Sequence, residues 1–199
     1  MSRELLIGDI HGCYYTLQQL LTKMNYGSDD VLSLTGDLVR KGPHGPQVLD
    51  WAIAHNVGSV LGNHDLYALM AMLGVSEDLS DSLTSADNKD AYIDWLIQLP
   101  FCQAWGKGIL VHASVSPHWQ LADALHWSKE LEDLLQSDPE GFAQYMQAPT
   151  VLDWQATMTH AERLRLALYL FTRARYYDGD LVMLSATGEP EAHPNLRPW

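Results

Sequence analysis

Three short clusters in the first part of the chain combine glycine with side chains that bind metal ions. They read GDIHG at residues 8–12, GD at residues 36–37 and GNHD at residues 62–65. In each cluster glycine lets the backbone bend and approach a ligand, and a neighbouring carboxylate, imidazole or amide supplies a donor atom. Mixed oxygen and imidazole donors suit manganese, iron, zinc or cobalt better than calcium, which prefers oxygen alone. The clusters therefore predict a site for transition-metal ions.

Each cluster follows a short apolar run that is typical of a buried strand. These runs are Leu5–Ile7, Val31–Leu34 and Val57–Leu61, and residues 17–24 and 48–53 between them carry apolar side chains at helical spacing. Strands that alternate with helices predict a parallel sheet with right-handed crossovers, whose ligands collect beyond the carboxyl ends of the strands. We therefore expect all three clusters at one edge of the sheet.

This edge suits a pair of metal ions. Two cations about 3.5–4 Å apart need a bridging carboxylate, and together they stabilise both the attacking and the leaving oxygen of an in-line displacement. Asp37 follows the middle strand, so we expect it to be the bridge. A lone Gly-Asp or Asn-His is more often an ordinary turn or a core histidine, but three clusters at successive strand ends favour a metal centre.

The rest of the chain is predicted to be mostly helical. Apolar spacing predicts a further strand and four helices, at Gly108–His112, Leu66–Leu73, Asp90–Leu99, Ser128–Leu135 and Glu162–Arg175. The Ser- and Asp-rich stretch at residues 76–89 predicts an exposed loop, or the polar start of a helix, that could form a mobile cover. The proline-rich tail at residues 187–199 predicts an irregular or extended segment.

Length and composition predict one folded α/β domain over residues 1–199, with 47% hydrophobic residues. No run reaches the ~20 apolar residues of a membrane span, and only Cys13 and Cys102 are present, so we expect a cytoplasmic protein with reduced thiols. The formal net charge of −13 argues against general DNA or RNA binding. It does not exclude a phosphorylated small molecule, because bound cations reverse the local field.

The clusters and several later segments resemble the calcineurin-like metallophosphoesterases, whose signature is GDxHG, GDxxxRG and GNH[DE]. The resemblance is greatest to the branch that holds phosphoprotein phosphatases and symmetrical bacterial diadenosine tetraphosphatases. The tetraphosphatases are the more similar of the two, through residues 36–39, 62–66, 110–113, 171–175 and 197–199. The resemblance implies an α/β two-sheet sandwich flanked by helices.

The resemblance also implies a dinuclear metal centre. Position by position, it makes Asp9, His11 and Asp37 the ligands of one ion, and Asp37, Asn63 and His112 those of the other. Asp37, as the bridge, also counts as a catalytic residue. The implied cofactors are two divalent cations, manganese or cobalt first, with iron or zinc as alternatives.

Further positions match groups that act on the substrate. His64 matches the general acid, and Arg173 or Arg175 matches a phosphate-binding residue, although either arginine could instead cap a helix end. The family arginine of GDxxxRG is Lys41 here, directly after Arg40. Because lysine keeps the charge but lacks the bidentate fork, we expect phosphate binding to be weaker or to be shared with Arg40.

The resemblance ends at Trp199, before a Gly-His motif that gives the family its last metal ligand. We therefore expect the second metal site to lack one ligand and the second sheet to be incomplete. Among the remaining histidines, His193 is the best stand-in for that ligand.

Three functions follow from this interpretation. The first is symmetrical hydrolysis of diadenosine tetraphosphate to two ADP, by an enzyme whose partner is a dinucleoside polyphosphate and not a membrane. The second is a Ser/Thr phosphoprotein phosphatase, which is disfavoured because those enzymes carry Asp where Arg40 stands. The third is a non-catalytic relative that binds a nucleotide or a metal. We expect the first, a dinuclear hydrolase.

Overall fold

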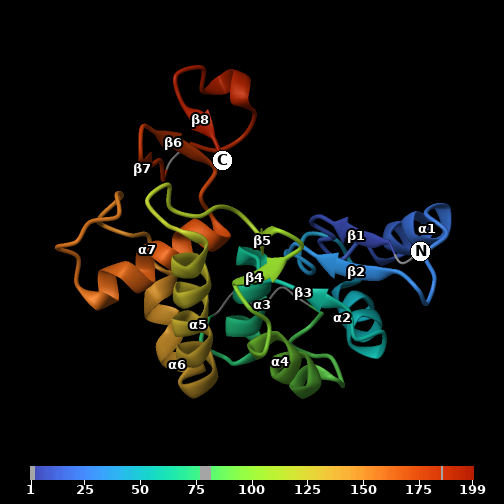
Figure 1. The fold of residues 1–199 in the computed structure, drawn as a ribbon. Coiled ribbons are helices and arrows are strands. Elements are labelled where there is room, and N and C mark those ends of the chain that lie inside the picture. The colour runs from blue at the N-terminus through green and yellow to red at the C-terminus, as the bar shows by residue number, and fades with distance from the viewer. Residues whose placement is uncertain (1–2, 77–81, 185) are drawn as a thin grey trace. The chain divides into compact units, whose positions relative to one another are not determined.

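The structure is a computed structural model that describes residues 3–76, 82–184 and 186–199. It divides into two units, Met1–Leu99 and Pro100–Trp199, which are labelled element by element in Figure 1. The expectation of a single domain over residues 1–199 stays a prediction. Residues 77–81 of the predicted loop at 76–89 lie outside the described residues.

The first unit contains a three-stranded parallel sheet in the order β1-β2-β3 (Figure 1). Leu6 of β1 lies opposite Ser33 of β2, and Leu34 of β2 lies opposite Ser59 of β3. The strands are β1 (Glu4–Ile7), β2 (Val31–Leu34) and β3 (Gly58–Ser59). The predicted parallel sheet is confirmed, although β3 is shorter than expected because only two of its residues pair with β2.

Two helices alternate with these strands, as predicted, namely α1 (Tyr14–Lys23) and α2 (Gly45–Ala54). The helices α3 (Asn63–Met72) and α4 (Lys89–Ile97) follow β3. In α1 the buried residues Leu17 and Leu21 are four apart, so they share one face of the helix. The prediction that the third helix begins at Leu66 is wrong. Helix α3 begins at Asn63, because the side chain of Asp65 accepts the backbone N–H of Gly62 and caps the first turn.

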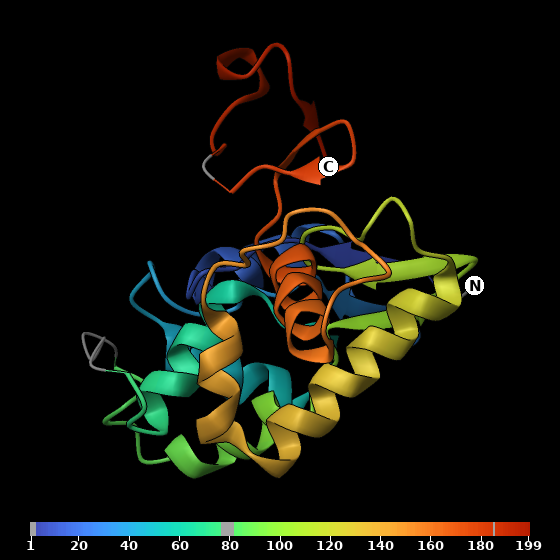
Figure 2. The same cartoon turned by 90° about the vertical axis from the view of Figure 1, so that its left-hand side faces the viewer.

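The second unit contains an antiparallel hairpin and three α-helices among its described residues. Its elements are β4 (Cys102–Trp105), β5 (Gly108–Val111), α5 (Leu121–Ser137), α6 (Pro139–Phe142) and α7 (His160–Thr172). Helices α5 and α7 pack against each other (Figure 2). Strand β5 confirms the predicted strand, but its partner β4 was not predicted. Helix α7 ends before the expected Arg175, because Arg173 leaves helical geometry at φ −133°.

The C-terminal residues form a small antiparallel sheet in the order β7-β6-β8. It consists of β6 (Tyr176–Asp178), β7 (Leu181–Val182) and β8 (Arg197–Pro198), and the single turns η1 (Ala143–Met146) and η2 (Pro190–Ala192) complete the unit. The predicted irregular or extended tail is therefore confirmed apart from the short turn η2. Across all described residues, no helix combines the length and the apolar character needed to cross a membrane.

Candidate metal centre

The first two polar clusters are joined through their backbones. The backbone N–H of His11 donates to the carbonyl of Asp37 at 2.8 Å, and that of Gly12 donates to the carbonyl of Leu38 at 2.8 Å. In return, the N–H of Gly42 donates to the carbonyl of His11 at 2.7 Å. A Cβ atom on Gly12 would lie 2.7 Å from the carbonyl oxygen of Gly42, so only glycine permits this approach. Backbone hydrogen bonds therefore hold the loops after β1 and β2 together.

The third cluster lies directly against the second. A Cβ atom on Gly62 would overlap the carboxylate of Asp37, and it would lie 2.5 Å from the backbone nitrogen of Asp37. The backbone N–H of His64 donates to Asp37 Oδ1 at 2.8 Å. The predicted convergence of all three clusters at one sheet edge is thus present in the first unit.

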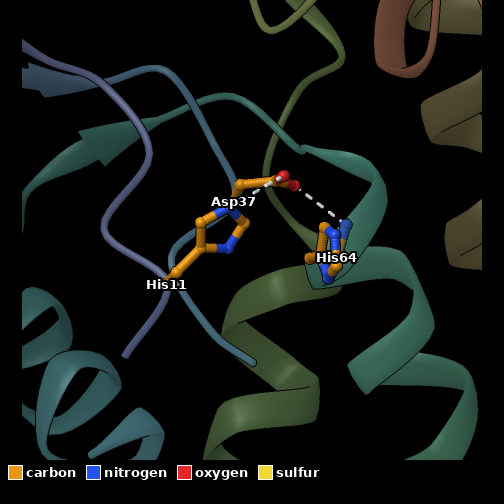
Figure 3. Close-up of side chains that lie close together, drawn as sticks. All are labelled: His11, Asp37 and His64. Atoms are coloured by element: carbon orange, nitrogen blue, oxygen red, sulfur yellow. Dashed lines mark hydrogen bonds and ion pairs between the residues drawn. The ribbon is translucent and has the colours of Figure 1, made fainter. Parts of the chain in front are cut away.

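Asp37 lies at the centre of this convergence with only 2% of its surface exposed. Its Oδ2 atom is 3.8 Å from Nε2 of His11, which is also 3.5 Å from Oδ2 of Asp9. His11, Asp37 and His64 offer donor atoms that all lie within 4.8 Å of one another, and Figure 3 shows both rings next to the carboxylate. A carboxylate and two imidazoles at this spacing are donors that suit a transition metal.

The ring of His11 can hold a cation in one of its two tautomers. Its Nδ1 atom lies 3.4 Å from the carbonyl oxygen of Val39, and a proton on Nδ1 leaves the lone pair on Nε2. The ammonium group of Lys41 lies 2.9 Å from Nε2, so a bound cation would replace this hydrogen bond. Metal-binding histidines usually donate their other ring N–H to a carbonyl or carboxylate in this way. The residues present therefore fit a bound divalent cation.

The backbone around the centre is strained. His11 and Asp37 have left-handed φ values of 48° and 53°, and the consecutive residues Arg40 and Lys41 have values of 68° and 61°. L-residues rarely adopt this region, and such conformations persist where the surroundings impose them, often at functional sites. The strain supports a site that is built for a ligand.

His64 lies beside Asp37. Its Nδ1 atom is buried and has no hydrogen-bond partner among the described residues. The ring is edge-on to His11 at 4.9 Å between centroids and to Tyr67 at 5.9 Å, and the guanidinium of Arg40 lies 5.3 Å from the Tyr67 ring. Burial lowers the pKa of His64, and the charge of Asp37 opposes this effect.

Asp65 is a buried acidic residue for which the sequence predicted no role at the site. It has no exposed surface, and its carboxylate accepts three backbone N–H groups, from Asp37, Leu38 and Gly62. Burial and the nearby charge of Asp37 raise its pKa to about 7, against the lowering effect of the three amides. The sequence signal was an acidic residue in the first turn of α3, which predicts only a helix cap.

The other predicted residues have separate positions. Asn63 is the first residue of α3, directly before His64. His112 directly follows β5 in the second unit, is 8% exposed, and has Nε2 3.5 Å from Nη2 of Arg175. Arg173 instead donates from Nη1 to the carbonyl of Met146 at 2.7 Å. The structure thus distinguishes the two arginines that the sequence left open.

The side chain of His193 contacts residues of the C-terminal part of the chain. Its Nε2 atom is 2.8 Å from the carbonyl of Thr187, and its ring lies 4.7 Å from that of Tyr176.

Comparison with known proteins identifies the family. The family model for calcineurin-like phosphoesterases matches residues 3–187. The chain therefore belongs to the calcineurin-like phosphoesterase family, and the predicted metallophosphoesterase fold is confirmed.

Individual relatives within the family carry more specific names. The chain is 37% identical to a symmetrical bis(5'-nucleosyl)-tetraphosphatase of Erwinia tasmaniensis, over 98% of this chain and 75% of that protein. It is 36% identical to the protein of the same name from Proteus mirabilis, over 98% and 76%. Among solved structures it is similar to a candidate diadenosine tetraphosphatase, with a TM-score of 0.51 and 28% identity over 62% of this chain and 61% of that one.

Proposed function

We propose that this chain is a metal-dependent hydrolase that cleaves a dinucleoside tetraphosphate symmetrically, with diadenosine tetraphosphate giving two ADP. The observation that carries the proposal is the buried Asp37 carboxylate next to the rings of His11 and His64. The chain also shares 36–37% identity with relatives named as symmetrical tetraphosphatases, over 98% of its length. The net charge of −13 argues against nucleic acid as the partner, and the proposed compartment is the cytoplasm.

The proposed metal ligands are the residues predicted from the sequence. Asp9, His11 and Asp37 would hold one divalent cation, and Asp37, Asn63 and His112 would hold the other. Two bound cations, with manganese or cobalt as the first choice, would lower the pKa of the attacking water and neutralise charge on the phosphoryl oxygens. The close approach of Gly62 to Asp37 would hold this carboxylate in place for the cations.

The remaining residues would hold the substrate and move one proton. His64 would donate a proton to the departing ADP oxygen, since its backbone is tied to Asp37 and its ring lies beside the same carboxylate. Lys41 and Arg175 would bind phosphate oxygens, because each already lies beside a proposed ligand histidine, His11 and His112 respectively. Arg40 remains a weaker phosphate candidate, since its guanidinium lies over the ring of Tyr67. We do not favour Arg173, which holds the carbonyl of Met146.

The substrate assignment is tested by product analysis. Purified protein is incubated with diadenosine tetraphosphate and Mn²⁺, and the nucleotides are separated by chromatography. We expect ADP as the sole nucleotide product, with activity abolished by excess EDTA and restored by added Mn²⁺ or Co²⁺. Asp37→Asn is the matched control, since it keeps the shape of the side chain but removes the bridging charge.

Each alternative gives a different result in this experiment. AMP plus ATP would contradict symmetrical cleavage, and unchanged hydrolysis in EDTA would contradict metal dependence. Turnover of a phosphopeptide without turnover of the dinucleotide would show a phosphoprotein phosphatase. Nucleotide or Mn²⁺ binding without any hydrolysis would show a non-catalytic relative.

A further inference from the structure

Both oxygens of the Asp65 carboxylate accept hydrogen bonds from backbone N–H groups of two loops. Its Oδ2 atom accepts the N–H of Asp37 at 2.8 Å and the N–H of Gly62 at 3.0 Å. Its Oδ1 atom accepts the N–H of Leu38 at 2.8 Å. Asp65 thereby connects the loop after β2 to the start of α3.

Each of these two segments also accepts a hydrogen bond from the other. While Asp65 holds the backbone of Asp37, the backbone N–H of His64 holds the carboxylate of Asp37 at 2.8 Å. Asp37 itself is left-handed, with φ 53°, a conformation that an L-residue keeps only when its surroundings impose it. Two bonds from the first turn of α3 therefore fix both the position of Asp37 and the direction of its side chain.

A fully buried carboxylate next to a second carboxylate is unfavourable unless hydrogen bonds compensate it. An apolar residue would avoid that penalty but would leave the three N–H groups without an acceptor, so the role of the acid lies in the backbone that its oxygens hold. Asp65 is also not a ligand, since it has no exposed surface and three N–H groups occupy its two oxygens. Its hydrogen bonds hold the backbone of Asp37 and of the neighbouring residue Leu38.

We propose that Asp65 is a positioning residue of the metal centre, which sets cation affinity by fixing the backbone of Asp37. The proposal rests on the metal centre of the proposed function and extends it to a residue outside the ligand set. Residues behind metal ligands typically change metal affinity roughly 10–100-fold when they are replaced.

Asparagine is the informative replacement, because it has the shape of aspartate but only one acceptor oxygen. In one amide orientation the N–H groups of Asp37 and Gly62 would face an NH₂ group, and in the other orientation that of Leu38 would. Asp65→Asn therefore disturbs the loop without removing any proposed ligand. Asp65→Glu keeps two carboxylate oxygens, so it is the conservative variant.

Asp50 provides a matched control in the same unit. It is also a carboxylate with hydrogen-bond partners, since Oδ1 accepts from the hydroxyl of Tyr92 at 2.8 Å and from the amide of Asn88 at 3.1 Å. It contacts none of the proposed ligands in these bonds. Asp50→Asn therefore tests the loss of a structural carboxylate without a change at Asp37.

The experiment is Mn²⁺ titration by calorimetry on the full chain and the three variants, with thermal unfolding and amide hydrogen exchange measured in parallel. We expect Asp65→Asn to lower Mn²⁺ affinity about 10–100-fold and to speed exchange at Asp37, Leu38 and Gly62. Asp65→Glu should recover most of the affinity. Asp50→Asn should lower the unfolding midpoint but keep wild-type affinity.

Wild-type Mn²⁺ affinity in folded Asp65→Asn would overturn the positioning role, and so would an equal loss of affinity in Asp50→Asn. If Asp65→Asn does not fold, Asp65→Ser takes its place, because a hydroxyl can accept an amide without adding an NH₂ group. A wild-type chain that binds no Mn²⁺ would overturn the proposed metal centre itself, which distinguishes the two failures.

Discussion

The two units hold their proposed metal ligands with different kinds of backbone. In the first unit, His11 and Asp37 are left-handed, and Asp37 lies against a glycine that no other residue could replace. In the second unit, His112 directly follows β5, and the residue after it donates its N–H to the carbonyl of Phe171 at 2.8 Å. The first arrangement is strained and crowded, whereas the second is an ordinary strand end held by one helix.

This difference indicates where each unit tolerates change. A crowded turn has space for glycine alone, so this constraint can be recognised in the sequence from the glycine itself. A strand end admits many residue types, so only the functional side chain is restricted. Substitutions at matched positions in the two units can test this contrast.

The largest effect is expected from glycine replacement. Gly62→Ala should abolish Mn²⁺ binding and lower activity by at least about 10²-fold, because its Cβ would displace the carboxylate of Asp37. Gly108→Ala in β5 is the matched control, since its Cβ would lie 4.0 Å from the nearest atom, the carbonyl oxygen of Trp105. Calorimetric titration and steady-state rates check both variants. Equal effects of the two substitutions would refute the contrast between the units.

A smaller and more specific loss is expected at His64. His64→Ala should lower kcat by about 10²–10⁴-fold, as for removal of a general acid, with Mn²⁺ binding retained. Metal binding should survive because the bond to Asp37 uses the backbone N–H of residue 64, which alanine also has.

His193→Ala in the second unit is the control for this loss. It should change neither the rate nor the dependence on Mn²⁺, because its ring bonds the carbonyl of Thr187. Metal content that falls together with rate in His64→Ala would show that this ring is a ligand. Loss of Mn²⁺ dependence in His193→Ala would show that the tail supplies a ligand.

Within the second unit, the two arginines should respond in opposite ways. Arg175→Ala should raise KM for the dinucleotide about tenfold or more, since a charged hydrogen bond contributes roughly 1.5–3 kcal/mol. Arg173→Ala should leave KM unchanged but lower the free energy of unfolding by about 1–3 kcal/mol, because the carbonyl of Met146 loses its donor. Kinetics and denaturant unfolding separate the two outcomes. A raised KM in Arg173→Ala would reverse the assignment.

The sequence predicted most of the first unit because its constraints are local. Glycine next to Asp, His or Asn at three strand ends indicates both the turn and its chemistry, and the parallel order β1-β2-β3 follows from the alternation of strands and helices. The role of Asp65 could not be predicted in this way. Two of its three partners are backbone amides of a loop 27 and 28 residues away, which leave no mark in the sequence.

The second unit was harder to predict for a related physical reason. Strand β4 has the sequence Cys-Gln-Ala-Trp, in which apolar and polar residues do not alternate clearly. It forms because it pairs with β5 across a tight turn. No Gly or Pro follows the apolar pattern of α7 before Gly179, so nothing in the sequence predicts that the helix ends at Thr172. The role of His112 rested on the family resemblance, since no local pattern marks it.

The smallest expected effect lies at the opposite edge of the first sheet. Arg3 and Asp30 precede β1 and β2, and the guanidinium of Arg3 contacts both carboxylate oxygens of Asp30, at 2.8 and 2.6 Å. This hydrogen bonding holds the pKa of Asp30 well below its usual range. Because the folded-state pKa is lowered, the pair stabilises the fold above the usual carboxyl pKa, and this contribution is lost as the pH falls through the acid range below about 4.

Asp30→Asn should therefore lower the stability of the fold near neutral pH and make little difference in strong acid, where the wild-type carboxyl is protonated as well. Mn²⁺ affinity should not change, because Asp30 lies directly before the start of β2, whereas Asp9 and Asp37 follow the other ends of β1 and β2. Denaturant unfolding of both proteins across this pH range, together with one calorimetric titration, tests the prediction. A stability difference that grows toward low pH would contradict the sign of the pKa shift. A fall in Mn²⁺ affinity would instead show that the two ends of this sheet are coupled, and that the strain around Asp37 depends on the register of β1 and β2 as well as on the glycines beside it.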